Sequence, residues 1–431
     1  MALLSRRDFL KSLAASSALS LTACQNLSHM PAKARVVIVG GGFGGATAAK
    51  TLRLLDDNLH VTLIEPKTSY VTCPGSNWLF AGLTNLERLT VDYQALKDYY
   101  AIDVLTDRVD AIDRNRRQVI LMSGGFVPYD RLILSPGIDF RWDAIDGYSS
   151  AMAEKFPHAW QAGPQTLLLA KQLQSMPDGG VVLIAAPPDP YRCPPGPYER
   201  ASMMAYWLRQ HKPRSKIIIL DPKRSFSKQA LFEAGWAKHY GYGTSNSLIE
   251  WHSLADNPVV LLDKSKKTLI TDFGDRFRGD VLNIIPPQVA NDLARQSHLT
   301  DSDGWCPIKP VTGQSMFDEF IHVIGDAANY SPLPKSAFAA NSEAKACAVG
   351  VIGLLNDQLP DEPSWINTCY SLVTPNHGIS VAGVYKLASD KTIMAVKGAG
   401  GISPQSTVSI AEKEASYALS AYQSLVNNTF N

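Results

Sequence analysis

The sequence predicts an α/β protein with two Rossmann-like, three-layer dinucleotide-binding domains and a C-terminal α+β interface domain. Three observations predict this fold class. Residues 35–55 read as a strand, a glycine-rich turn and a helix; residues 180–211 read as a second strand, turn and helix; and a third apolar strand ends at Gly325 and Asp326 before a long helix. Strands that alternate with helices are typical of parallel sheets covered by helices.

The composition is that of a globular protein with a large core. The chain has 431 residues, enough for two or three domains, with 45% hydrophobic and 19% charged residues. The net charge of +1 gives no reason to expect nucleic acid as a partner. No uninterrupted apolar run approaches about 18 residues, so we expect no membrane-spanning helix.

Residues 1–34 are predicted to be an export signal. Arg6 and Arg7, followed by Phe9-Leu10-Lys11, form a twin-arginine motif, so we expect export by the Tat route to the periplasm. Cys24 closes a sequence that resembles a lipobox. Two outcomes are open: cleavage before Cys24 with a weak lipid anchor there, or ordinary cleavage near residues 32–34.

Residues 35–65 form the first dinucleotide-binding unit. A β-branched strand at 35–39 is followed by six residues, 40–45, of which five are glycine, then by a helix at 46–55 and a strand at 60–65. Gly40, Gly42 and Gly45 allow the tight turn and the close approach of phosphates at a helix N-terminus. Glu65 follows Gly45 by 20 residues, where a carboxylate binds the adenosine ribose.

Two later segments favour FAD as the dinucleotide. Residues 129–137 resemble the strand and turn that close the first FAD lobe in flavoproteins with two dinucleotide domains. Gly325 and Asp326 resemble the second FAD motif of those proteins, in which the aspartate binds a ribityl hydroxyl. We therefore expect a FAD-binding domain in two parts, 35–150 and 290–355, an inserted NAD-like domain at 151–289, and the interface domain at 356–431.

The second dinucleotide unit lacks its glycine fingerprint. Prolines and Cys193 follow the predicted strand at 180–185, and proline has no N–H to offer a pyrophosphate. The nicotinamide site is therefore predicted to be replaced by a thiol site. Because a helix is expected from about Tyr198, its dipole should favour a redox-active thiolate at Cys193. Glu199, in the first turn, could stabilise that helix end or transfer a proton.

The other cysteines have different surroundings. Six cysteines in an exported protein suggest at least one disulfide, but spacing alone does not pair Cys193 with Cys369. Cys73 follows Glu65, the predicted ribose ligand. Two states of Cys73 are open: a thioether to the flavin or a buried free thiol. Cys306 and Cys347 are predicted to be packed thiols. The histidines show no paired ligand spacing, so we predict no metal, and no haem-attachment motif occurs.

The chain resembles the flavoprotein subunit of flavocytochrome c sulfide dehydrogenase, a family of the FAD-dependent pyridine nucleotide-disulfide oxidoreductases with a glutathione-reductase-like fold. The resemblance is carried by the glycine turn and the residues after it at 40–50, by residues 63–66, by Thr72-Cys73, by the proline-cysteine segment at 192–201, and by residues 304–307, 323–326, 334–336 and 367–371. It implies FAD attached through an 8α-thioether to Cys73, and a Cys193–Cys369 disulfide beside the flavin with Glu199 near it. The family also has a tryptophan close to the flavin, which residues 403–414 lack.

The resemblance also implies a function. We expect oxidation of hydrosulfide to sulfur or polysulfide through the disulfide and FAD, with electrons passed to a separate c-type cytochrome subunit. A sulfide:quinone reductase is an alternative, although residues 382–431 are polar for a membrane-facing tail. Two further alternatives are an NAD(P)H-driven disulfide reductase and a non-catalytic flavin-binding partner protein. The sequence leaves open which of the two cysteines is attacked by sulfide. The helix dipole alone favours Cys193 as the sulfur that reacts with the flavin.

Overall fold

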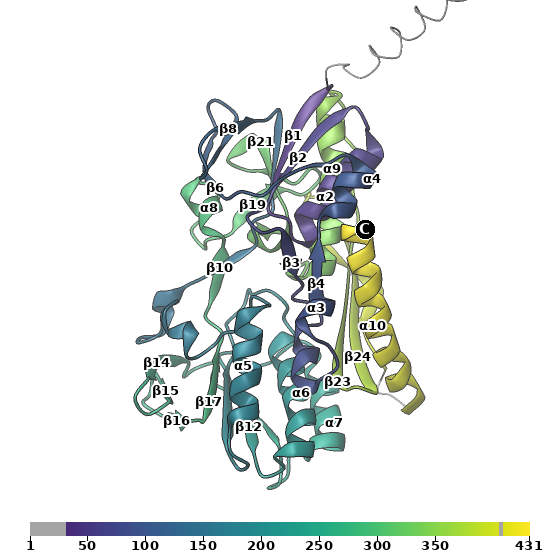
Figure 1. Ribbon diagram of the computed structural model, residues 1–431. Coiled ribbons are helices and arrows are strands. Elements are labelled where there is room, and N and C mark those ends of the chain that lie inside the picture. The colour runs from purple at the N-terminus through teal and green to yellow at the C-terminus, as the bar shows by residue number, and fades with distance from the viewer. Residues whose placement is uncertain (1–31, 405–407) are drawn as a thin grey trace, which may run out of the picture.

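The computed structural model describes residues 32–404 and 408–431. Figure 1 shows a large sheet with α2, α4 and α9 at one end of the molecule and a second α/β unit with α5, α6 and α7 at the other. The C-terminal helix α10 (Val408–Phe430), drawn in yellow, runs along the side. The predicted twin-arginine motif and Cys24 lie outside the described residues.

The first domain is built on a sheet of eight strands. Its neighbours β21, β9, β1, β2 and β5 all run parallel, and β19 and β20 extend it in antiparallel fashion. In spatial order the strands are β22 (Ala328–Asn329), β19 (Cys306–Lys309), β20 (Gln314–Ser315), β21 (Asp318–Val323), β9 (Arg131–Leu134), β1 (Ala34–Val39), β2 (Leu59–Ile64) and β5 (Asp103–Leu105).

Helices and two small sheets complete this domain. Residues 36–39 of β1 are all buried, because α2 and α9 pack on one another beside the sheet. The helices are α2 (Phe43–Leu55), α3 (Leu86–Leu89), α4 (Gln94–Tyr100), α8 (Asp292–Gln296) and α9 (Ala337–Leu355), with 3-10 turns at Ser76–Ala81 and Gly325–Ala327. The small sheets are β3 (Ser69–Val71) with β4 (Thr90–Asp92), and β6 (Val109–Asp113), β7 (Gln118–Leu121) and β8 (Phe126–Pro128).

Helix α9 is long and apolar enough, by length and composition, to cross a membrane, which the sequence did not lead us to expect. Half of its most apolar window is buried, and it packs against α2 and against strand β23 (Trp365–Thr374). Its N-terminus is capped by Ser336, whose Oγ accepts a hydrogen bond from the Ala339 N–H at 3.0 Å. These contacts are those of a core helix.

The second domain contains four parallel strands in the order β13, β12, β11, β17. Two short strands, β10 and β18, pair where the chain passes between the domains. The elements are α5 (Pro164–Ser175), β11 (Val181–Ala185), α6 (Gly196–His211), β12 (Lys216–Asp221), α7 (Gln229–Tyr240), β13 (Ile249–Ser253), the antiparallel strands β14 (Val259–Asp263), β15 (Thr268–Thr271) and β16 (Arg276–Arg278), then β17 (Val281–Ile284), with β10 at Ile138–Phe140 and β18 at Gln288–Ala290.

The C-terminal part is an antiparallel sheet of β23 (Trp365–Thr374), β24 (His377–Leu387) and β25 (Ile393–Ile402), together with α10. Helix α10 packs on β23 and β24 and reaches α2 of the first domain. Strand β23 also contacts α6 and α9, which belong to the two different domains. The C-terminal sheet therefore joins both α/β domains. This architecture has the predicted fold class.

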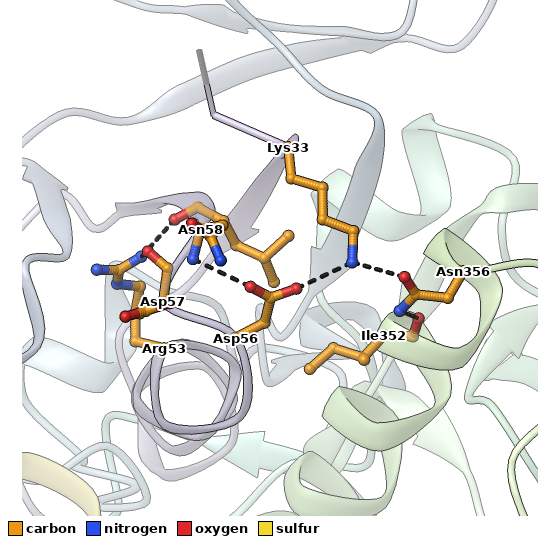
Figure 2. A network of polar contacts seen from close by, with 8 residues as sticks. Lys33, Arg53, Asp56, Asp57, Asn58, Ile352 and Asn356 are labelled. Carbon is orange, nitrogen blue, oxygen red and sulfur yellow. Dashed lines mark hydrogen bonds and ion pairs between the residues drawn. The ribbon is translucent and has the colours of Figure 1, made fainter. Parts of the chain in front are cut away.

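A polar network fixes the point where the described chain enters the first sheet. Figure 2 shows Lys33 between Asp56 and Asn356. The Lys33 Nζ donates to Asp56 Oδ2 at 3.1 Å and to Asn356 Oδ1 at 2.6 Å. Asp56 also accepts from the Asn58 N–H at 3.0 Å. The network joins the start of β1 to the C-terminal ends of α2 and α9, far from the glycine turn.

Candidate functional site

A cavity of about 560 Å³ opens where the glycine turn, the second domain and the C-terminal sheet meet. It brings together residues from distant parts of the chain, such as Gly40 and Cys369, which are 329 positions apart. Nine of the ten predicted site residues line it: Gly40, Gly42, Glu65, Cys73, Cys193, Glu199, Gly325, Asp326 and Cys369. The tenth, Gly45, lies behind the wall of the cavity.

The three fingerprint glycines meet three different requirements. Gly40 has a φ of 99°, and a Cβ there would lie 2.3 Å from the Ser135 carbonyl oxygen. A Cβ on Gly45 would lie 1.9 Å from the Gly40 carbonyl oxygen, so this glycine lets α2 pack closely on the turn. Gly42 is different, because a Cβ there would clash with nothing and would project toward the cavity. The chain thus leaves bare backbone where a phosphate would approach.

The N-terminus of α2 provides donors for that phosphate. Gly42 is its N-cap, and no side chain caps the helix. The N–H groups of the first turn have no partner within a helix, so they carry a partial positive charge toward the cavity. Beside them, Glu65 Oε2 accepts from the Gly41 N–H at 2.8 Å, which holds the carboxylate at the cavity wall.

Asp326 supplies a buried acceptor without a partner. Its Oδ1 is buried and makes no hydrogen bond among the described residues, while Oδ2 lies 3.8 Å from Nη1 of Arg192. Burial raises the pKa of this carboxyl group, and Arg192 opposes that effect. A ribityl hydroxyl donating to Oδ1 would satisfy the group. The glycine turn, the uncapped helix, Glu65 and Asp326 therefore fit FAD.

Cys193 is held in an unusual backbone conformation. Its φ is 59°, in the left-handed region, and its N–H donates to the Lys335 carbonyl oxygen at 2.8 Å. Its own carbonyl accepts from the Gly196 N–H at 2.8 Å, which closes the turn before α6. A Cβ on Gly196 would lie 3.2 Å from the Cys193 Sγ and 2.6 Å from the Trp160 ring. The segment thus fixes the sulfur at the cavity wall.

The expected thiolate at Cys193 is wrong for the thiol in this structure. Helix α6 begins at Gly196, two residues closer to Cys193 than the predicted start near Tyr198, and its dipole should lower the pKa of the thiol. However, burial raises the pKa of the Cys193 thiol well above its ordinary value, and the nearby Cys369 and Glu199 raise it further. Desolvation of the charged form outweighs the helix dipole here.

The structure gives Cys73, Cys193, Cys306, Cys347 and Cys369 as free thiols. Cys73, Cys193 and Cys369 line the cavity and are half-buried, whereas Cys306 in β19 and Cys347 in α9 are fully buried. Burial raises the pKa of the Cys306 thiol to about 12. The predicted Cys193–Cys369 disulfide stays a prediction, although both residues line the cavity and Cys369 contributes to raising the pKa of the Cys193 thiol.

Glu199 neither caps its own helix nor faces solvent. Its Oε1 accepts from the Leu372 N–H at 3.0 Å and from the Trp78 Nε1 at 3.2 Å, and its Oε2 accepts from the Asn77 Nδ2 at 3.0 Å. The carboxylate therefore joins α6 to β23 and to the 3-10 turn after Cys73. Three donors point at the carboxylate and fix it beside the two cysteines. The side chain makes no capping hydrogen bond to α6, and the two roles left open for Glu199, at the helix end and in proton transfer, stay predictions.

The second domain keeps a carboxylate where an NAD ribose would bind, but protein groups occupy it. Asp221 ends β12, as Glu65 follows β2, and is fully buried. Its Oδ2 accepts from the Tyr198 hydroxyl at 2.5 Å and the Trp251 Nε1 at 2.9 Å, while Oδ1 pairs with Lys223 at 2.6 Å. No lone carboxylate is left for a ribose. This finding agrees with the loss of the glycine fingerprint.

Sequence reasoning missed several residues at the cavity. Trp78 and Tyr422 line it and meet edge to face, with ring centroids 5.5 Å apart. The Tyr422 hydroxyl lies 2.9 Å from the Thr72 Oγ1, beside Cys73. Arg192 lines the cavity next to Asp326, and Lys228 reaches Cys369 from α7. No local pattern marks these residues, because the fold brings them together from distant segments.

Three family models together cover most of the described chain. Residues 166–286 match the central region of the sulfide dehydrogenase (flavocytochrome c) flavoprotein chain. Residues 361–430 match the flavin-binding region of flavocytochrome c sulphide dehydrogenase, and residues 34–160 match the pyridine nucleotide-disulphide oxidoreductases. The sulfide dehydrogenase (flavocytochrome c) flavoprotein chain of Chlorobaculum thiosulfatiphilum is 70% identical over 43 residues, 10% of this chain and 90% of the relative. The chain belongs to this family of flavoprotein chains.

More distant relatives of the flavocytochrome c flavoprotein chain share most of the length. The mitochondrial sulfide:quinone oxidoreductase of Dictyostelium discoideum is 22% identical over 325 residues, 72% of this chain and 68% of the relative. The solved sulfide:quinone oxidoreductase of Aquifex aeolicus aligns with a TM-score of 0.71 at 17% identity, covering 92% of each chain. Putidaredoxin reductase in its putidaredoxin complex aligns with a TM-score of 0.63 at 19% identity, covering 93% of this chain and 94% of that one. These structures confirm the predicted fold class.

Proposed function

We propose that this flavoprotein chain oxidises hydrosulfide to sulfur or polysulfide through a Cys193–Cys369 disulfide and FAD, and passes the electrons to a c-type cytochrome subunit. One observation carries the proposal. The cavity that fits FAD is also lined by Cys193 and Cys369, and Asp221, the carboxylate of the second domain at the NAD ribose position, is already occupied by protein groups. Family membership and the sulfide-oxidising relatives support the same substrate.

Residues of two segments would hold FAD. The α2 N-terminus and Gly42 would bind the pyrophosphate, Glu65 the adenosine ribose, and Asp326 the ribityl chain. When bound, FAD supplies an acceptor of two electrons that can release them one at a time to a haem. Cys73, which lines the cavity, would bond to it as a thioether.

The chain's own residues would perform the first chemical step. Hydrosulfide attacks one sulfur of the Cys193–Cys369 disulfide, a new S–S bond forms, and the old S–S bond breaks. The products are a persulfide on one cysteine and a thiolate on the other, so atoms and charge balance. Glu199 holds the 3-10 turn, α6 and β23 around this pair through its three accepted hydrogen bonds.

The electron acceptor and the compartment are part of the proposal. The family description supports a c-type cytochrome partner, and the twin-arginine motif at Arg6 and Arg7 supports Tat export to the periplasm. The sulfide:quinone oxidoreductases among the relatives favour quinone as the alternative acceptor. Steady-state assays with sulfide and either cytochrome c or a soluble quinone separate the two. Faster turnover with quinone would contradict the cytochrome assignment.

Anaerobic titration with sulfide tests the disulfide directly. Cys193→Ser and Cys369→Ser should each keep FAD but lose its bleaching by sulfide, because neither variant can form the bridge. Cys347→Ala is the matched control, since Cys347 is buried in α9 and does not line the cavity. It should bleach like the wild-type protein. Wild-type bleaching rates in either serine variant would contradict the disulfide mechanism.

A further inference from the structure

Lys228 is a buried cation at the cysteine pair. It is the N-cap residue of α7 and only 6% exposed. Its φ of 62° and ψ of 27° lie in the left-handed region, which is strained for a residue with a side chain. A strained backbone conformation at a buried lysine requires surrounding contacts that hold it in place.

The contacts that hold Lys228 come from the strand that carries Cys369. Its Nζ donates to the Cys369 carbonyl oxygen at 3.0 Å and to the Ser371 Oγ at 2.8 Å. Both acceptors are neutral, and an ammonium group has three donors. One N–H of Lys228 is therefore left for a further acceptor close to Cys369.

The charge of Lys228 has no carboxylate partner. None of the ion pairs among the described residues includes it. Burial lowers the pKa of Lys228, and the groups that oppose this effect are, in order, Cys369, Glu199, Cys193 and Glu414. Glu199 is already bound by three N–H donors. A buried cation without an anion is costly, and an anion at Cys369 would offset that cost.

The two cysteines are not equivalent with respect to this cation. Burial is the largest influence on the pKa of both thiols and raises it. For Cys369, Lys228 is the next influence and lowers the pKa. For Cys193, Lys228 acts only after Cys369 and Glu199, both of which raise the pKa. The environment therefore favours a thiolate at Cys369 over one at Cys193.

We propose that Lys228 is a positioning residue that stabilises the Cys369 thiolate when the disulfide opens, which makes Cys369 the leaving sulfur and Cys193 the sulfur attacked by hydrosulfide. The inference rests on the proposed function. Hydrosulfide bonds to the Cys193 Sγ and keeps its proton, and the electron pair of the broken S–S bond stays on the Cys369 Sγ. The leaving sulfur in such an exchange is the one with the lower thiol pKa. This assignment reverses the preference that the helix dipole alone suggested.

Alkylation of Cys369 tests the inference without sulfide. In reduced holoprotein carrying Cys193→Ser, the rate of Cys369 modification by iodoacetamide is followed against pH by peptide mass spectrometry. Adding Lys228→Met should move the midpoint of that profile upward by about one to three pH units, because an adjacent cation is lost. Lys228→Arg keeps the charge and should leave the midpoint near that of the parent.

An unchanged midpoint in Lys228→Met with bound FAD would overturn the inference. If Lys228→Met does not fold, Ser371→Ala decides, since it removes one anchor of the ammonium group and keeps the charge. A smaller upward shift of the alkylation midpoint in Ser371→Ala supports the inference. An unchanged midpoint in this variant overturns it. Because no sulfide is present, a failure here is distinct from a failure of the proposed function, in which sulfide would not bleach the wild-type flavin.

The position of the added sulfur gives a second readout. The wild-type protein is mixed with one equivalent of sulfide and quenched with acid. The extra sulfur should then be found on the peptide that contains Cys193. In Lys228→Met, we expect it on both cysteine peptides, because the bias toward Cys369 as leaving sulfur is lost. Extra sulfur mainly on Cys369 in the wild-type protein would contradict the assignment.

Discussion

At the residue scale, the cavity wall depends on backbone geometry that only particular side chains permit. Cys193 adopts a positive φ, and Gly196 leaves room for its sulfur next to the Trp160 ring. The prolines on either side of the turn restrict the backbone further. Such strain at a functional position persists because the surrounding contacts determine it. The reactive group is thus positioned before any substrate arrives.

Cys73 is the residue at which covalent flavin attachment can be tested. It lies in the turn after β3, and its Sγ is 3.7 Å from the Trp160 carbonyl oxygen at the cavity wall. Acid-precipitated protein should stay yellow, because a thioether survives denaturation. Cys73→Ser should release the colour to the supernatant, whereas the control Cys306→Ser should not. Yellow supernatant from the wild-type protein would contradict the attachment.

Residue roles were only partly predictable from the sequence. Motif spacing led to Gly40, Glu65 and Asp326, because close backbone approach and ribose binding require these residue types at fixed distances. The state of the Cys193 thiol was not predictable, since burial comes from the whole fold. The partners of Glu199 and the presence of Lys228 depend on β23, more than 140 positions away in the case of Lys228.

At the scale of elements, α10 connects the C-terminal sheet to the dinucleotide domain. Its last turn buries Phe430, whose ring lies 5.4 Å from the Phe43 ring and 5.9 Å from the Tyr70 ring. Phe43 and Tyr70 both line the cavity. Packing at the end of α10 therefore supports the wall beside the glycine turn.

Phe430→Ala should weaken this junction. Loss of a fully buried phenylalanine typically costs about 3–5 kcal/mol, because a cavity remains where the ring was. We expect a lower midpoint in urea unfolding and faster loss of non-covalently held flavin in a Cys73→Ser background. The matched control is Leu419→Ala, on the exposed side of the same helix. Equal effects of the two substitutions would contradict the packing role of Phe430.

Elements with strong local patterns were predictable, and those shaped by packing were less so. The strand predicted at 180–185 corresponds to β11, Val181–Ala185, and the long helix predicted after Asp326 is α9, which Ser336 caps. Helix α2 begins at Phe43, three residues before the expected start, because Gly44 and Gly45 continue the helix where close packing favours them over their low propensity. The long strands β23–β25 were not foreseen, although Pro375 and Asn376 are turn residues and form the turn between β23 and β24.

At the scale of the whole molecule, the two α/β domains and the C-terminal sheet each contribute to one cavity. Topology was predictable because strand-turn-helix units with parallel strands have few alternative arrangements. The loss of the NAD site in the second domain was predictable only in part. The prolines indicated it, but the hydrogen bonds that occupy Asp221 are tertiary contacts.

Buried neutral histidines should make stability depend on acid pH. Burial lowers the pKa of His377 and His322 to about 4 and of His158 to about 3, from 6.5. Below pH 6.5 the unfolded chain takes up protons that the folded chain does not, so stability is lost as the pH falls toward 4. His377→Gln should reduce the loss in the urea midpoint, and the exposed control His60→Gln should not. An unchanged loss in His377→Gln would contradict this reasoning.

The central claim is that Cys193 and Cys369 together transfer electrons from sulfide to the flavin bound in the same chain. The most direct measurement is an anaerobic titration of the purified wild-type holoprotein with sulfide, followed by the yellow flavin absorbance. The account predicts bleaching that is complete near stoichiometric sulfide and absent with NADH. Intact FAD that sulfide does not bleach would contradict it.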